Sequence, residues 1–148
     1  MAYLFKQQFN INDLIAERAV NPSVVSVVPV VVVEPEIYLA KLAEKYLLAA
    51  GLQVNYCANP VLLTEFLRRT SSSALLINPA AYMEIKHAAK AIADIRDNFP
   101  RLAVVTIAHN LEAEELGQLM SAGIASHINR KLSRPQDVAD IIKTLINL

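Results

Sequence analysis

The sequence predicts an α/β fold in which helices cover both faces of a parallel sheet. From about residue 30 to the end, short apolar, often β-branched runs alternate with longer segments of helical periodicity. Hydrophobic residues make up 54% of the chain and charged residues only 19%, a composition typical of strands that are buried from both sides. The length of 148 residues suits a single domain with its own core.

The first predicted strand covers residues 30–33 and ends at Glu34-Pro35-Glu36. A helix is expected over 37–50, where Gly51 is a suitable residue to follow its C-terminus. The second strand is expected over 52–57. Asn59 then caps a helix that runs from Pro60 to about residue 70, because Asn at the cap and Pro in the first turn favour a helix start.

The second half of the chain repeats this alternation. Residues 74–77 form an apolar strand, and Asn78-Pro79 opens a helix that we expect to reach about residue 98. A fourth strand is predicted over 102–108, and a helix over 111–121 begins with acidic residues that suit the positive end of its dipole. A weak fifth strand at 125–129 and an amphipathic helix at 135–148 complete the pattern.

Five strands alternating with helices imply right-handed crossovers and, at this length, the doubly wound flavodoxin-like strand order 2-1-3-4-5. In this order the topological switch point lies between the first and third strands. Ligand chemistry is therefore expected at the carboxyl ends of those strands, which are Glu34-Pro35-Glu36 and Asn78-Pro79.

Residues 1–26 lie outside this pattern and are predicted to be an N-terminal extension to a domain formed by residues 27–148. A helix is expected over 12–18, with Asn21-Pro22 as its stop. The segment is either a packed-on extension or an arm for dimerisation or partner docking. It lacks the apolar core of a signal peptide, and the apolar run at 24–33 is shorter than the roughly 20 residues of a membrane-spanning helix.

Three segments together resemble the receiver domain of bacterial response regulators over about residues 29–148. VVVVEPEIYLAKLAEKYLLAAGLQV is similar to a receiver's first strand, acidic turn, first helix and the glycine before its second strand. SALLINPA is similar to the third strand with its phosphoacceptor turn. SAGIASHINRKLSRPQDV resembles the short strand and basic turn that precede the last helix. The resemblance implies a CheY-like fold and a role in two-component signalling.

The residues that the resemblance would make functional are largely replaced. It puts Asn78 at the phosphoacceptor aspartate, and Glu34 and Pro35 at the acid pair that helps to hold Mg²⁺. An amide is a poor nucleophile, and Pro35 has no side-chain ligand for a metal. We therefore predict a degenerate (pseudo-) receiver that is not an enzyme and has no cofactor and no metal site.

Two further positions of the resemblance are ambiguous. Thr106 is the hydroxyl nearest the family's switch position, although the spacing favours Ile107 or Ala108. The family's lysine is matched by Arg130, or by Lys131 if the alignment shifts by one residue. A plainer interpretation also stands, in which both Pro-containing turns are simple helix starts.

Other chemistry is disfavoured by the residues present. Cys57 falls on a buried strand, the three histidines show no metal-ligand spacing, and three glycines are too few for a phosphate-binding loop. Fourteen basic and fourteen acidic residues give a net charge of zero, which predicts neither nucleic-acid nor membrane binding. A lone cysteine fits a reducing compartment, so we expect a cytoplasmic protein.

The resulting hypothesis is a phosphorylation-independent signalling or regulatory module that binds proteins, either a partner or a second copy. By resemblance, the docking face would run from the fourth helix to the fifth, or it would involve the N-terminal arm. The chain ends with its last helix, so we expect an adaptor or a subunit of an assembly. The alternative is a flavodoxin-like enzyme or ligand-binding protein with a pocket near Glu34, Asn78 and Arg130. The partner-face candidates are Glu112, Glu115, Leu119, His127 and Arg134.

Overall fold

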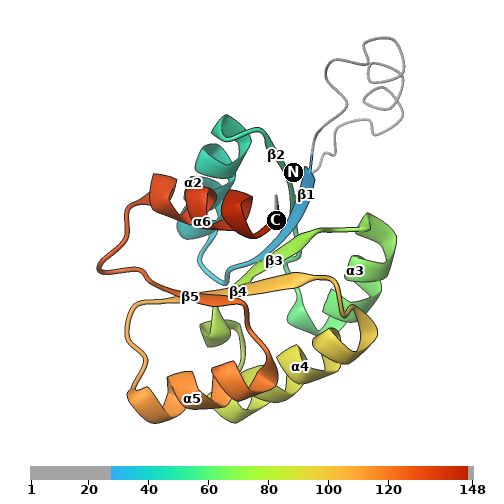
Figure 1. Ribbon diagram of the computed structural model, residues 1–148, viewed down its shortest axis with the longest axis vertical. Helices are drawn as coiled ribbons and strands as arrows, with labels where there is room; N and C mark the ends of the chain where they lie inside the picture. Colours follow the sequence, from blue (N-terminus) through green and yellow to red (C-terminus); the bar gives the residue numbers. More distant parts are fainter. Residues whose placement is uncertain (1–27, 147–148) are drawn as a thin grey trace.

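The computed structural model describes residues 28–146 and shows a five-stranded parallel sheet in the order β2-β1-β3-β4-β5 (Figure 1). Every neighbouring pair of strands is parallel, so the predicted topology is confirmed. The strands are β1 (Val28–Val33), β2 (Leu52–Tyr56), β3 (Ala74–Ile77), β4 (Ala103–Ala108) and β5 (Ser126–Asn129).

Strand β1, which has a neighbour on each side, explains why the apolar runs of this sequence lack alternation. Val31 and Val33 belong to the hydrophobic cluster on one face of the sheet. Val30 and Val32 belong to the cluster on the other face. All four side chains are at most 2% exposed, because a parallel sheet between two helical layers buries both faces of its strands.

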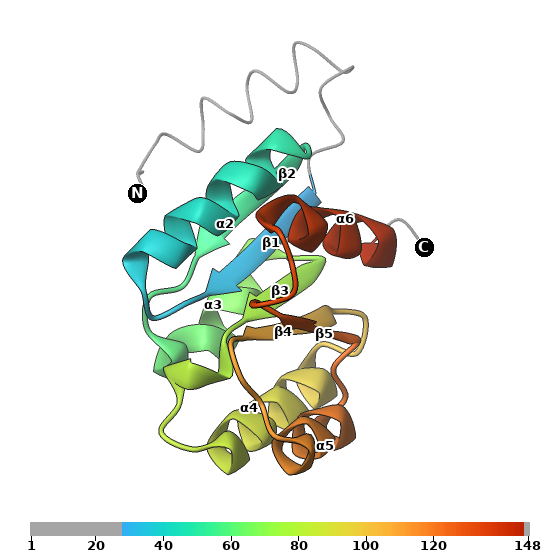
Figure 2. The same cartoon turned by 90° about the vertical axis from the view of Figure 1, so that its left-hand side faces the viewer.

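Two helices cover one face of the sheet and three cover the other (Figures 1 and 2). The pair α2–α6 packs over the cluster that contains Val30, and α3, α4 and α5 pack over the cluster that contains Val31. The helices are α2 (Ile37–Ala49), α3 (Leu63–Thr70), α4 (Ile85–Asn98), α5 (Ala113–Ala122) and α6 (Pro135–Ile146).

The two helices predicted to begin at an Asn-Pro pair have different outcomes. The first begins at Asn59-Pro60 as predicted, as a 3-10 turn that leads directly into α3, whereas the helix predicted from Asn78-Pro79 is interrupted. Pro60–Leu62 and Pro79–Ala81 form single 3-10 turns, each held by the preceding asparagine, whose Oδ1 accepts a hydrogen bond from the backbone N–H two residues later. After the second turn the backbone of Tyr82 and Glu84 is extended, so α4 begins only at Ile85. The half-buried Tyr82 packs against the core, which interrupts the helix expected over 79–98.

The remaining boundaries agree with the sequence pattern to within about two residues. Gly51 and Gly123 follow α2 and α5 with φ of 86° and 106°, a backbone that favours glycine. The predicted N-terminal extension and its helix lie outside the described residues, so that prediction remains untested. Within residues 28–146, no helix is long and apolar enough to cross a membrane.

Candidate functional site

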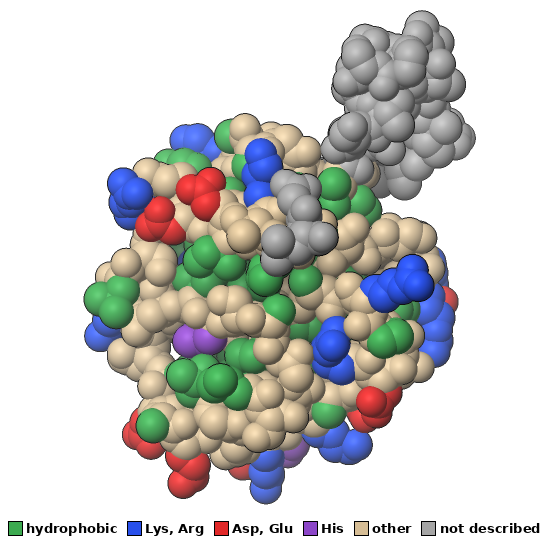
Figure 3. Space-filling view, viewed as in Figure 1, with side chains coloured by type: hydrophobic (Ala, Val, Ile, Leu, Met, Phe, Trp, Pro, Cys, Tyr) green, Lys and Arg blue, Asp and Glu red, His purple; other side chains and the backbone are tan. Residues whose placement is uncertain are grey.

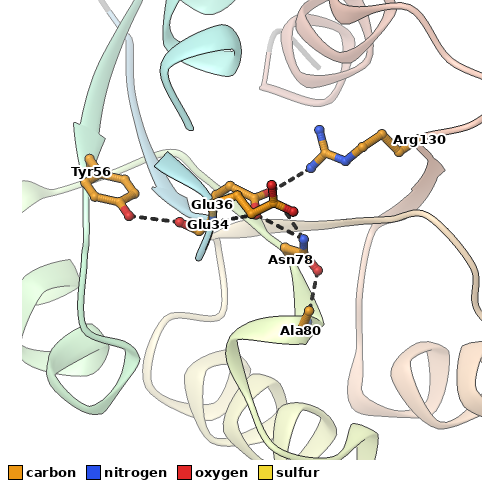
Figure 4. Close-up of polar contacts among 6 residues, drawn as sticks. All are labelled: Glu34, Glu36, Tyr56, Asn78, Ala80 and Arg130. Carbon is orange, nitrogen blue, oxygen red and sulfur yellow. Dashed lines mark hydrogen bonds and ion pairs between the residues drawn. The ribbon is translucent and has the colours of Figure 1, made fainter. Parts of the chain in front are cut away.

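Three side chains converge at the edge of the sheet where the strands end. Glu34 follows β1, Asn78 follows β3 and Arg130 follows β5. The register pairs Val33 with Ile77. The next residues, Glu34 and Asn78, therefore lie beside each other beyond the ends of the two strands. Arg130 follows β5, which is two strands away from β3, and its long side chain reaches across the end of β4 (Figure 4).

The Glu34 carboxylate is the centre of this cluster. Its Oε1 accepts a hydrogen bond from Arg130 Nη2 at 2.6 Å, which is also an ion pair. The Asn78 Nδ2 donates to both carboxylate oxygens at 3.2 Å, and the backbone N–H of Glu36 donates to Oε2 at 3.2 Å. Asn78 is fixed in turn, because its Oδ1 accepts from the Ala80 N–H at 2.9 Å (Figure 4). We call these three side chains the Glu34–Asn78–Arg130 network.

The network is almost entirely removed from solvent. The side chain of Glu34 is 3% exposed and that of Arg130 is 16% exposed. A buried carboxylate is tolerated only when it is paired and hydrogen-bonded, and charge-assisted bonds such as Arg–carboxylate are the strong ones. Both oxygens of Glu34 already have two donors each, so this carboxylate is satisfied from within the protein.

This arrangement is poorly suited to phosphoryl chemistry or to metal binding. The neutral amide of Asn78 is oriented by two sets of hydrogen bonds and is not a nucleophile. A cation would have to displace Arg130 from Glu34, and an anion would meet a guanidinium whose charge Glu34 already balances. In the described part of the chain, no group of three or more His, Cys, Asp or Glu residues could hold a metal ion.

Tyr56, which was not among the predicted site residues, also belongs to this edge. Its hydroxyl donates to the backbone carbonyl of Glu34 at 2.8 Å. Burial, followed by the nearby Glu34 charge, raises the pKa of Tyr56, so the phenol keeps the proton that it donates. The signal was present in the sequence, because Tyr56 ends β2 and pairs with Val32 of β1.

The other predicted site residues lie outside the network. Pro35 is exposed. Lys131 is also exposed, and its backbone N–H donates to Asn129 Oδ1; Arg130 and not Lys131 pairs with Glu34. Thr106 is fully buried in β4, opposite Ile77, and therefore sits one residue short of the level of Asn78.

Thr106 instead pairs with His127. The Thr106 hydroxyl and the His127 Nδ1 are 2.8 Å apart and share a hydrogen bond, and the two residues are partners in the β4–β5 register. Burial lowers the pKa of His127, which favours the neutral imidazole. Thr106 and His127, both predicted as functional residues, therefore contact each other between β4 and β5.

One predicted member of the partner face is wrong. Leu119 is 0% exposed and packs in the core with the residues of α3 and α4, because α5 turns this position toward the sheet. Its neighbour Met120 is 63% exposed. Glu115 accepts a hydrogen bond from the Glu112 N–H at the start of α5, and Arg134 pairs with Asp137 at 3.2 Å.

Comparisons with known proteins identify the fold but not a sequence family. No family model matches the sequence, and no curated protein matches it. Solved structures do match. A response regulator from Thermotoga maritima is 20% identical with a TM-score of 0.73, over 82% of this chain and 99% of that one. The fold is that of a response-regulator receiver domain.

Two further solved structures are similar to this chain. One is described as an atypical orphan response regulator with a phosphorylation-independent regulatory mechanism; it is 14% identical, with a TM-score of 0.70, over 81% of this chain and 96% of that one. The other is a putative pilus assembly protein (cpaE) from Burkholderia thailandensis, 19% identical, with a TM-score of 0.67, over 82% of this chain and 99% of that one.

The ion pair of the network predicts a large effect of Arg130→Met. This change leaves the buried Glu34 carboxylate without its cation, so the free energy of unfolding should fall by about 3–5 kcal/mol. The matched control Lys131→Met, at the exposed next position, should change it by less than about 0.5 kcal/mol. Urea unfolding at pH 7 measures both. Equal stability of the two variants would contradict the inferred role of the pair.

Asn78→Asp should destabilise the fold, because it replaces an amide donor 3.2 Å from both Glu34 oxygens with a second carboxylate. We expect a loss of about 1–3 kcal/mol at pH 7. In the folded variant the two carboxyl groups retain a proton to higher pH than in the unfolded chain, so the loss should shrink as the pH falls toward about 4.

The control for this change is Asn59→Asp. Asn59 precedes a proline and caps a 3-10 turn as Asn78 does, but it is exposed and its Oδ1 bonds only the Val61 N–H. Because Asp caps as well as Asn, its urea midpoint at pH 7 should stay close to that of the wild type. A similar loss in both variants would show that the Glu34 carboxylate is not the cause.

Proposed function

We propose that this protein is a phosphorylation-independent signalling or regulatory module of receiver fold, which acts by binding other proteins and catalyses no reaction. The observation that carries the proposal is the Glu34–Asn78–Arg130 network. It fills the end of the sheet where a working receiver would hold its phosphoacceptor and metal ion. The protein therefore does not depend on phosphate to set its conformation.

The network supports the proposal through its energetics. Phosphorylation of a receiver needs a free carboxylate nucleophile and an acidic site for Mg²⁺. Here the only buried acid, within the described residues, is Glu34, and its partner is a guanidinium that remains charged at any physiological pH. A metal ion at Glu34 would leave the Arg130 guanidinium, whose side chain is 16% exposed, without its counter-ion, so a metal ion is a poor competitor for Glu34.

The similar structures are in keeping with this proposal. An atypical orphan response regulator with a phosphorylation-independent mechanism has the same fold, and so has a putative pilus assembly protein. The alternative of an enzyme that uses Glu34, Asn78 and Arg130 is not favoured, because Asn78 and Arg130 both bond the Glu34 carboxylate.

The face formed by α5, β5 and α6 supports protein binding. Strand β5 lies at the edge of the sheet, and an edge strand offers backbone groups to a partner. Hydrophobic side chains gather in the middle of the face seen in Figure 3, and most of the charged side chains lie around its margin. Along α5, β5 and α6, Met120 is exposed, and Ile124, His127 and Ile141 are half-buried.

The first test is exposure to acetyl phosphate and Mg²⁺, followed by measurement of the intact mass. We expect no phosphoryl group on the wild type. Asn78→Asp alone should also remain unmodified, because Pro35 supplies no metal ligand and Arg130 occupies Glu34. A working receiver domain in the same buffer is the positive control. A stable phosphoryl adduct on the wild-type chain would overturn the proposal.

The second test compares two exposed methionines. Met120 lies on the proposed face, and Met83 lies in the connection between β3 and α4 with 93% exposure. Met120→Glu should lower partner recovery in a pull-down, or self-association in sedimentation, by at least about tenfold, because it places a charge in an apolar contact. Met83→Glu should leave both unchanged. A second bait without residues 1–26 tests the N-terminal arm. Equal binding by both methionine variants would exclude this face.

A further inference from the structure

A cavity of about 220 Å³ lies between the sheet and the helix pair α2–α6. Its floor consists of strand residues from β1, β3 and β4, and its walls are apolar side chains of α2 and α6. The ion pair of Glu34 and Arg130 lies at one end. The other polar residues that line it are Ser133 and Arg134. The apolar residues that line it are Val32, Val33, Leu76 and Ile107 on the sheet, Leu39, Leu42, Ala43 and Leu47 on α2, and Pro135 and Val138 on α6.

The size of this cavity is unusual for the interior of a small domain. Protein cores are packed as densely as organic crystals and contain few voids larger than a water molecule. An apolar cavity of roughly 150 Å³ is already large enough to bind benzene. On that scale, the cavity under α2 and α6 has room for about nine non-hydrogen atoms.

The polar end of the cavity presents donors rather than acceptors. Arg130 uses Nη2 for Glu34, whereas its buried Nε has no hydrogen-bond partner among the described residues. The remaining terminal nitrogen points away from Glu34, toward the side on which α2 and α6 lie (Figure 4). The Glu34 oxygens are fully occupied by donors. A ligand at this end would therefore have to supply an acceptor.

The charge at this end is already balanced. The Glu34 carboxylate lies 2.6 Å from the Arg130 guanidinium, and Arg134, which also lines the cavity, pairs with Asp137 at 3.2 Å. An anionic ligand would therefore approach two ion pairs and not a free cation. A neutral acceptor, such as a carbonyl or ether oxygen, can accept a hydrogen bond from Arg130 without disturbing the pair of Arg130 and Glu34.

We propose that this cavity binds a small, neutral and mainly apolar molecule of about nine non-hydrogen atoms, which presents one hydrogen-bond-accepting oxygen to Arg130. The walls provide affinity through burial of apolar surface, and the guanidinium fixes the orientation. The cavity and the proposed partner face share helix α6, because Pro135 and Val138 of α6, and Arg134 directly before it, line the cavity.

Two probes of nearly identical shape test this proposal. Acetophenone has an aromatic ring and a carbonyl oxygen, and α-methylstyrene carries a methylene group in place of that oxygen. We expect acetophenone to bind with a dissociation constant on the order of 1 mM or tighter. α-Methylstyrene should bind about tenfold more weakly, because it leaves the Arg130 donor unpaired once water is excluded.

Methyl-detected NMR titration of the full chain shows where each probe binds. Shifts are expected for Leu39, Leu42 and Val138, which line the cavity. The methyl groups of Leu67 and Ile92, in the core on the opposite face of the sheet, should not move. Shifts of equal size on both faces would overturn the proposal, and equal affinity for the two probes would overturn the role of Arg130.

A pair of alanine variants on α2 provides the matched control. Ala43→Leu fills part of the cavity and should weaken acetophenone binding at least about tenfold. Ala49→Leu adds the same atoms at an exposed position of the same helix and should leave binding unchanged. Circular dichroism checks that both variants fold. If Ala43→Leu fails to fold, the affinities of the wild type for the two probes still test the proposal. Unaltered binding to a folded Ala43→Leu variant would overturn the cavity as the site.

Discussion

The ion pair between Glu34 and Arg130 connects parts of the chain that are 96 residues apart. It joins the end of strand β1 to the end of the edge strand β5, and Asn78, which follows the central strand β3, donates to the same carboxylate. Since the Glu34 side chain is only 3% exposed, its charge has to be balanced inside the protein. The edge of the sheet where a receiver performs its chemistry is thereby used to hold strands together.

The residues of the network suit one another. A working receiver site gathers acids around a bound metal ion, which supplies the positive charge. In this protein Arg130 supplies that charge permanently, and an amide at position 78 can donate to Glu34 where a carboxylate could not. Arg130 and Asn78 are therefore complementary to the same carboxylate, and reverting one alone conflicts with the other. Such mutual consistency is expected of residues that specify one structure.

The apolar runs predicted the sheet well, because segments such as Val30–Val33 have few alternatives to a doubly buried strand. The predicted strand order alone is enough to place Glu34 beside Asn78, since both directly follow neighbouring parallel strands. The Arg130 ion pair was not predictable, because it depends on a long side chain crossing the end of β4. Tertiary packing overrides the local sequence pattern in three places. It extends the backbone at Tyr82 and Glu84, it turns Leu119 toward the core, and it leaves the cavity.

The two proposals of ligand binding and partner binding meet in β5. Arg130 directly follows the edge strand, and its backbone N–H donates to the Ala108 carbonyl at 2.8 Å, so the residue that would face a ligand is fixed to the strand that would face a partner. A ligand can change partner binding only if it favours one arrangement of these groups over another. Such coupling would pass over a short distance, from the cavity through the Arg130 guanidinium to the end of β5. Under these two proposals, this route would let a neutral molecule influence the face that binds a partner.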